Sequence, residues 1–214
     1  MKKIIILGAG GFGREVDMLI DQMNGVSEQW ELLGFIDDEK QVATKIGGSK
    51  VLGQLAELDK YPEAWLVLAI GNPKTKEQVV RTLGGEIRFA TLIHPNVLIG
   101  KRVEIGDGSI ICAGSIVTTH INIGKHVILN LSCRVGHDTV IGDYYSFMPA
   151  INILGEVVIE KGVYVGTGAK IINQLRIGEQ TTIGAGAVVS KSLPANCTAV
   201  GIPAKPIKFH GGIG

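Results

Sequence analysis

The stretch IGKRVEIGDGSIICAGSIVTTHINIGKHVILN, residues 99–130, carries a large apolar residue at every sixth position, and the spacing continues without a slip to residue 189. The residue two places earlier is mostly small or β-branched, and the residue that follows is often glycine. The positions in phase are Ile99, Ile105, Ile111, Val117, Ile123, Leu129, Val135, Ile141, Phe147, Ile153, Ile159, Val165, Ile171, Ile177, Ile183 and Val189. A six-residue repeat sustained over this length predicts a parallel β-helix.

Each six-residue unit is expected to form one short strand and a turn. Side chains alternate between the two faces of a strand, so the large residue and the small one two places before it point inward together. Glycine suits the turn because it has no Cβ. Three units would close a triangular coil of 18 residues, which makes about five coils, and each coil must bury its inner face against its neighbours.

The composition limits the possible partners and the cellular compartment. The chain has 214 residues, of which 45% are apolar and 19% charged, with 21 basic residues against 20 acidic ones. This balance gives no indication of a nucleic-acid or membrane-surface partner. No apolar run is long enough to span a membrane and no signal peptide is evident, so we expect a cytoplasmic protein. Three widely spaced cysteines predict neither a disulfide framework nor a metal site.

An alternating β/α pattern precedes the repeat. Strands are expected at residues 3–7, 32–36, 64–70 and 89–93, and helices at 14–23, 55–58 and 74–83. Such alternation predicts a parallel sheet. The pattern stops near residue 90, at about half the size of a two-nucleotide Rossmann domain. We therefore expect an α/β half-Rossmann domain over residues 1–93, a β-helix over 94–192, and an extended, proline-punctuated tail over 193–214.

The glycine-rich segment Gly8-Ala9-Gly10-Gly11-Phe12-Gly13 has three interpretations. One is dinucleotide binding, with Asp37 on a ribose. A second is that the helix N-terminus holds another phosphate-bearing ligand, such as a nucleotide sugar. The third is a tight turn without a ligand. The absence of a second half-domain favours the nucleotide-linked ligand over NAD(P).

Three histidines stand out on coil faces that are otherwise poor in reactive groups: His120, His126 and His137. A metal centre is one hypothesis, but their spacings of six and eleven do not converge within one chain, and we expect no metal. His137 lies at a turn and is expected to face solvent, where a neutral imidazole suits a general base. The 18-residue period predicts that His120, Asp138 and Glu156 stack at one corner, with Asp138 beside His137.

Several short segments, in this order, resemble one family. After the glycine-rich segment come FIDD (residues 35–38), AIGN (69–72), IHP (93–95), GHD (136–138) and GIPAK (201–205). Over residues 2–208 the chain resembles the bacterial sugar acyltransferases, which include UDP-4-amino-sugar N-acetyltransferases and sialic-acid O-acetyltransferases. The resemblance implies left-handed coils, a homotrimer with sites between subunits, and acetyl-CoA as co-substrate.

The resemblance also implies roles for individual residues. His137 corresponds to the catalytic histidine, and Asp138 to a partner that is a glutamate in some members and here is one methylene shorter. Asn130 matches an active-site asparagine. The positions matching the acetyl-CoA site are Ser146, Gly166, Thr167 and Ala185. Apart from the resemblance, the 18-residue period places Gly155 one coil after His137, where its N–H is the expected oxyanion donor. The positions matching the nucleotide pocket of the acceptor are Gly10, Gly11, Phe12, Asp37, Asp38 and Asn72.

These observations predict an acetyl-CoA-dependent acetyltransferase of glycan biosynthesis. The expected acceptor is a nucleotide-linked amino sugar, acetylated by direct transfer with His137 as the base. The alternative is O-acetylation of sialic acid or another sugar. A more distant alternative is a non-catalytic protein that binds a nucleotide or NAD(P).

Overall fold

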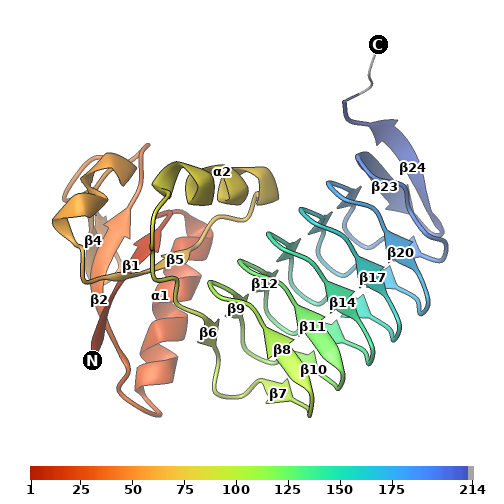
Figure 1. Cartoon of the computed structure of the whole chain (residues 1–214), viewed down its shortest axis with the longest axis horizontal. Helices are drawn as coiled ribbons and strands as arrows, with labels where there is room; N and C mark the ends of the chain where they lie inside the picture. Colours follow the sequence, from red (N-terminus) through yellow and green to blue (C-terminus); the bar gives the residue numbers. More distant parts are fainter. Residues whose placement is uncertain (212–214) are drawn as a thin grey trace.

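The computed structural model describes residues 1–211, which form an α/β domain and a triangular β-helix joined side by side (Figure 1). The α/β domain contains β1 (Lys2–Leu7), α1 (Gly11–Asn24), β2 (Trp30–Ile36), β3 (Lys45–Ile46), β4 (Ser49–Gly53), the 3₁₀ helix η1 (Leu55–Lys60), β5 (Trp65–Leu68) and α2 (Pro73–Leu83). The strand order is β3-β4-β2-β1-β5, and every pair is parallel except β3 with β4. The predicted parallel sheet is thus confirmed.

The β-helix is built from strands of two or three residues. They are β6 (Leu92–Ile93), β7 (Leu98–Ile99), β8 (Val103–Ile105), β9 (Ile110–Ile111), β10 (Ile116–Val117), β11 (Ile121–Ile123), β12 (Ile128–Leu129), β13 (Arg134–Val135), β14 (Val140–Ile141), β15 (Ser146–Phe147), β16 (Asn152–Ile153), β17 (Val158–Ile159), β18 (Tyr164–Val165), β19 (Lys170–Ile171), β20 (Arg176–Ile177), β21 (Thr182–Ile183) and β22 (Val188–Val189). Each pairs in parallel with the third strand along, as when Val117 faces Val135, so the predicted 18-residue coil is confirmed.

The in-phase residues form the core of the β-helix. From residue 111 to residue 189, all of them are at most 4% exposed. Ile99 is 40% exposed because the first coil has no complete coil beneath it. The turns use backbone conformations that side chains rarely adopt. The third turn residue after β7, β10, β13, β16 and β19 has φ between 55° and 62° in every coil, at Arg102, His120, Asp138, Glu156 and Gln174.

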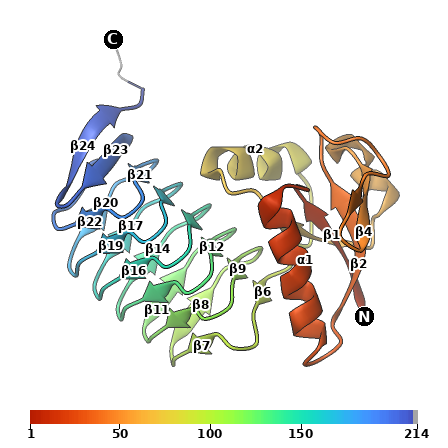
Figure 2. The same ribbon diagram turned by 180° about the vertical axis from the view of Figure 1, so that it is seen from behind.

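The boundary between the domains differs from the expected strand at residues 89–93. Phe89 forms a bridge with Leu66 of the α/β sheet, whereas Leu92 and Ile93 pair with β9 and begin the β-helix. The outward residues Ile110 and Ile128 of the first coils lie in the same buried cluster as the α/β core. Figure 2 shows α1 beside this face of the coils. The two domains therefore share one apolar interface.

The chain closes with a hairpin where the sequence predicted an extended tail. β23 (Cys197–Gly201) pairs in parallel with β21, and β24 (Ala204–Phe209) returns antiparallel to β23. The tail therefore continues one sheet of the β-helix. No helix in residues 1–211 has the length and apolar character needed to cross a membrane.

The stacked core predicts a strong dependence of stability on the inward residues. Phe147 is fully buried, so Phe147→Ala should lower the free energy of unfolding by about 3–5 kcal/mol, through lost burial and the cavity left behind. Val140 points outward from a neighbouring strand and is 43% exposed, so Val140→Ala should change it by less than about 0.5 kcal/mol. Urea titration measures both, and equal effects would contradict the assignment of faces.

Candidate active site

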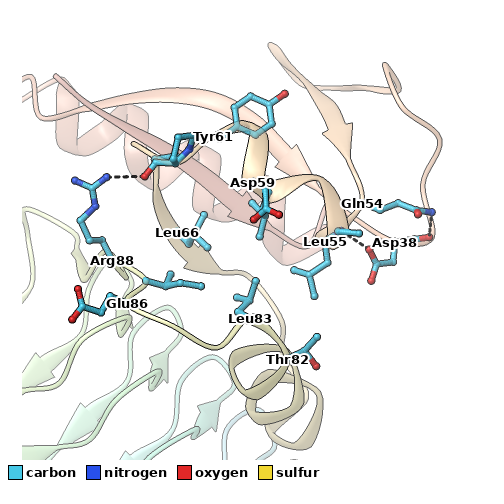
Figure 3. A pocket seen from close by; sticks show the side chains of 15 residues that line it. Asp38, Gln54, Leu55, Asp59, Tyr61, Leu66, Thr82, Leu83, Glu86 and Arg88 are labelled. Carbon is cyan, nitrogen blue, oxygen red and sulfur yellow. Dashed lines mark hydrogen bonds between the residues drawn. The ribbon is translucent and has the colours of Figure 1, made fainter.

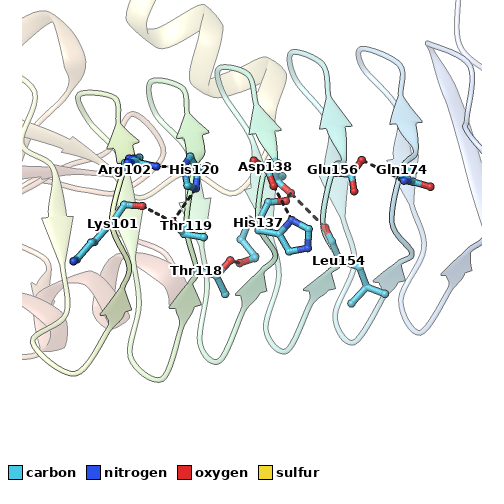
Figure 4. Close-up of polar contacts among 12 residues, drawn as sticks. Lys101, Arg102, Thr118, Thr119, His120, His137, Asp138, Leu154, Glu156 and Gln174 are labelled. Carbon is cyan, nitrogen blue, oxygen red and sulfur yellow. Dashed lines mark hydrogen bonds and ion pairs between the residues drawn. The ribbon is translucent and has the colours of Figure 1, made fainter.

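His137 and Asp138 form a polar pair in the turn between β13 and β14. The imidazole Nδ1 lies 2.8 Å from Asp138 Oδ2, so the shorter carboxylate does reach the ring (Figure 4). The two side chains are 57% and 56% exposed, as expected for residues at a corner of the coil. A carboxylate that accepts a hydrogen bond from Nδ1–H leaves Nε2 with its lone pair free. This geometry gives an exposed imidazole whose orientation is set by its neighbour in sequence.

Gly155, one coil after His137, makes room for the imidazole. A Cβ at this position would lie 2.5 Å from both Cε1 and Nε2 of His137, closer than van der Waals contact allows. Its carbonyl oxygen accepts a hydrogen bond from the Gln174 backbone N–H. Within residues 1–211, the Gly155 N–H has no backbone acceptor. Gly155 therefore places a free backbone donor beside the ring.

The predicted corner stack is present in the backbone. Asp138 N donates to the Thr119 carbonyl and Glu156 N to the His137 carbonyl, so His120, Asp138 and Glu156 occupy successive coils. The side-chain partners, however, are not those expected. Asp138 is bonded to His137, and no hydrogen bond between Asp138 and His120 occurs in the part of the chain that the structure describes.

His120 is instead bonded to the coil on its other side. Its Nε2 lies 2.6 Å from Arg102 Nη1, and its Nδ1 lies 3.0 Å from Thr119 Oγ1. A guanidinium can only donate, so His120 Nε2 is the acceptor in this contact. Glu156 likewise accepts from Gln174 Nε2 at 3.2 Å. His120 therefore contacts Arg102 of the preceding coil rather than Asp138.

Asn130 and most of the acetyl-CoA candidates lie at a different corner of the prism from His137. Asn130 follows β12, is 5% exposed, and accepts the Leu131 N–H on Oδ1 at 2.7 Å. Gly166 and Ala185 follow β18 and β21 of the same sheet, and a Cβ on Gly166 would lie 2.5 Å from Ala185 N. Thr167 is stacked with this pair, its carbonyl accepting the Gly186 N–H. These residues form one column, separated from His137 by one side of the coil.

Ser146 lies on the outer face of this sheet rather than in the turn. It is fully buried, and its hydroxyl has no hydrogen-bond partner within residues 1–211.

Asp37 holds the glycine-rich loop in place. Its Oδ2 accepts the Ala9 N–H at 2.8 Å, and its Oδ1 accepts the N–H groups of Glu39 and Lys40. Both carboxylate oxygens thus fix backbone around the nucleotide-pocket candidates. The third glycine of the motif has a packing role, because a Cβ on Gly13 would lie 2.2 Å from the Gly8 carbonyl oxygen.

The remaining loop candidates are open to a ligand. A Cβ on Gly10 would meet nothing within 4 Å, and one on Gly11 only Arg14 Nη2 at 4.0 Å. Phe12 is partly buried against the α/β core.

Asp38 and Asn72 face two different cavities. Asp38 accepts the Leu55 N–H at 2.7 Å and lines a cavity of about 840 Å³ between η1 and the end of α2 (Figure 3). Asn72 caps α2 through the Thr75 N–H at 3.1 Å and lines a cavity of about 480 Å³ between the domains. We call the second cavity the interdomain pocket; its lining residues are Gly71, Asn72, Pro73, Lys74, Met148, Gly162, Tyr164, Gln180 and Thr182.

Lys76 and His126 are buried polar residues whose importance the sequence reasoning missed. Lys76 is fully buried, and His126 is 4% exposed. A signal was available, since Lys76 shares the inward helical face of Val79, Val80 and Leu83, where a lysine is out of place. In residues 1–211, no three His, Cys, Asp or Glu side chains are placed to hold a metal ion.

Comparison with known proteins adds to this geometry. Residues 3–83 match the family "PglD N-terminal domain", and residues 85–119 and 156–191 match "Bacterial transferase hexapeptide (six repeats)". The chain is 36% identical over 212 residues to the GDP-perosamine N-acetyltransferase of Escherichia coli O157:H7, covering 95% of each protein. The chain belongs to the bacterial sugar acetyltransferase family.

Other members of this sugar acetyltransferase family agree with the assignment. The UDP-N-acetylbacillosamine N-acetyltransferase of Bacillus subtilis is 35% identical over 121 residues, covering 53% of this chain and 52% of that protein. A perosamine N-acetyltransferase mutant from Caulobacter crescentus, solved with CoA and GDP-perosamine, is 26% identical with a TM-score of 0.86, covering 96% and 97% of the two chains. The acetyltransferase domain of PglB from Neisseria gonorrhoeae, solved with acetyl coenzyme A, is 27% identical with a TM-score of 0.86, covering 96% and 99%. The predicted fold, a half-Rossmann domain followed by a left-handed β-helix, is confirmed.

Proposed function

We propose that this family member transfers the acetyl group of acetyl-CoA to the amino group of a nucleotide-linked amino sugar. The observation that carries the proposal is the exposed His137–Asp138 pair, in a chain that aligns over 95% of its length with a sugar N-acetyltransferase. A base is needed at such a site because an ammonium group has no lone pair, and the attacking amine must lose a proton during transfer.

In this mechanism His137 acts through Nε2. The amine nitrogen of the sugar attacks the thioester carbonyl carbon, and its proton passes to Nε2 while Asp138 stabilises the imidazolium through Nδ1–H. The carbonyl oxygen becomes an oxyanion, for which the free N–H of Gly155 is our proposed donor. The C–S bond then breaks, the amide is complete, and the proton held by His137 is available to the leaving thiolate.

Direct transfer forms no acyl-enzyme intermediate. The burial of the cysteines supports this mechanism, because a buried thiol is a poor nucleophile. All three are buried. Burial raises the pKa of Cys112 to about 12 and that of Cys133 to about 11, so neither forms the thiolate needed for nucleophilic attack near neutral pH.

We further propose that the active protein is a homotrimer with sites between subunits. In one chain, the column of Asn130, Gly166, Thr167 and Ala185 and the His137 corner lie at opposite ends of one prism side. A neighbouring subunit would bring its His137 corner next to the column of Asn130, Gly166, Thr167 and Ala185. Exposed apolar side chains beside both corners support a contact there, since Leu131 is 36% and Leu154 is 50% exposed.

His137→Ala tests the base directly. The change removes the proton acceptor while leaving the coil core intact, so kcat should fall by about 10²–10⁴-fold. Initial rates with acetyl-CoA and a panel of UDP- and GDP-linked amino sugars measure it, with circular dichroism as the control for folding. A rate equal to that of the wild type would rule out His137 as the base. A thermal-shift comparison with NAD(P) checks the dinucleotide alternative.

Asp138→Asn tests the role of the carboxylate. Asparagine keeps an acceptor oxygen for Nδ1–H but removes the negative charge, so protonation of His137 becomes less favourable. The acid limb of the kcat/KM–pH profile should therefore move to lower pH. His120→Ala is the matched control, because His120 is bonded to Arg102 and should leave the profile unchanged. An unmoved profile for Asp138→Asn would reduce Asp138 to a surface residue.

The assembly is tested by sedimentation velocity at micromolar concentration. We expect a species three times the mass of the 22.7 kDa chain. A monomer with full activity at the same concentration would disprove sites shared between subunits.

A further inference from the structure

Lys76 joins the two domains through a buried amine. It lies in the second turn of α2, in the α/β domain, and its side chain is fully buried. Its Nζ donates to the carbonyl oxygen of His126 at 2.8 Å and to that of Tyr145. These acceptors belong to successive coils of the β-helix. One side chain of the α/β domain is therefore bonded to the backbone of two coils.

Aromatic rings pack around the backbone that this amine contacts. The His126 ring is stacked on Tyr144, with centroids 5.3 Å apart, and meets the edge of Phe89 at 4.6 Å. Burial, and then the charge of Lys76, lower the pKa of His126 to about 4, so this ring is neutral near neutral pH. Burial also lowers the pKa of Lys76 well below its usual value. An amine has at least two N–H donors in either protonation state, so both bonds persist across the working pH range.

The next residue of α2 makes a second, weaker contact with the β-helix. Glu77 accepts from Lys161 Nζ at 2.7 Å, beside Tyr144, and from Arg81 at 3.0 Å. The side chains of Lys161 and Arg81 are 45% and 79% exposed. The Glu77–Lys161 ion pair therefore contributes little to the free energy of the contact between α2 and the coils. The buried amine is the contact that fixes the position of α2 on the coils.

The start of α2 forms one wall of the interdomain pocket. Asn72, Pro73 and Lys74 face Met148 and Tyr164 of the β-helix across this pocket. Lys76 lies one turn further along the same helix, so its two bonds set the separation of these walls. We infer that Lys76 is a positioning residue for the nucleotide-linked acceptor, holding the α/β side of the interdomain pocket in register with the coils. This inference rests on the proposed function.

Lys76→Met tests the inference, because methionine has a similar length and no donor. We expect the KM for the acceptor to rise about tenfold, with kcat and the KM for acetyl-CoA within about twofold of the wild type, the pattern of lost ground-state binding. Amide hydrogen exchange should rise in α2 and stay unchanged in the coils. Lys161→Met is the matched control: it removes the exposed pair with Glu77 and should leave both KM values unchanged.

Two kinetic results would overturn the positioning role. One is an unchanged acceptor KM in Lys76→Met. The other is an equal rise in both KM values, which indicates a general loss of structure. Should Lys76→Met not fold, Lys76→Gln, which is shorter but keeps a donor, takes the same test, and failure of both to fold would make Lys76 a core residue only. A wild-type protein that acetylates no nucleotide amino sugar would instead refute the proposed function.

Discussion

The closure of each coil after 18 residues is the constraint on which the rest of the molecule depends. An inward aliphatic side chain at every sixth residue can be buried only if the next coil repeats the same path, so the backbone is copied from coil to coil. The copying includes the corners, where the third residue after each of β7, β10, β13, β16 and β19 adopts a left-handed conformation. Asp138 sits at one of these positions, and the bend brings its carboxylate back to the ring of His137. The pairing of two adjacent residues that we propose to be catalytic thus follows from the repeat.

The same constraint explains how much of the structure was readable in the sequence. The positions of the coil strands between residues 99 and 189, the coil period and the exposure of His137 follow from spacing alone, and these were predicted correctly. The side-chain contact of His120 with Arg102 was not predicted. Coil stacking places Arg102 on one side of His120 and Asp138 on the other, and the choice between them depends on side-chain hydrogen bonding. Leu92 and Ile93 were expected in the α/β sheet but pair with β9 of the β-helix. A strand of only two residues has too short a sequence pattern to show which strand it pairs with.

The helical periodicity of α2 shows that Lys76 lies on an apolar face, but it does not explain why a lysine is there. Burying an unpaired amine costs several kcal/mol, so its place on the apolar face of α2 required acceptors that only the β-helix provides. The His126 carbonyl lies at a corner where, among residues 1–211, no backbone N–H donates to it. The sequence pattern of α2 alone cannot predict this hydrogen bond, because its acceptor lies fifty residues away in the chain.

The two domains supply different parts of the proposed site. The stacked coils of the β-helix bring His137 and Gly155 together at one corner. It has no long loops with which to hold a large acceptor. The α/β domain supplies the glycine-rich loop and Asn72, yet it rests on the coils chiefly through an apolar contact at Ile110 and Ile128, which resists separation better than sliding. Hydrogen bonds are directional, so two of them from one buried amine restrict the sliding that apolar packing permits. If His137 is the base, as we propose, the acceptor must be held accurately relative to the coils. Apolar packing would be sufficient for stability, but this accuracy calls for a directional polar contact such as that of Lys76.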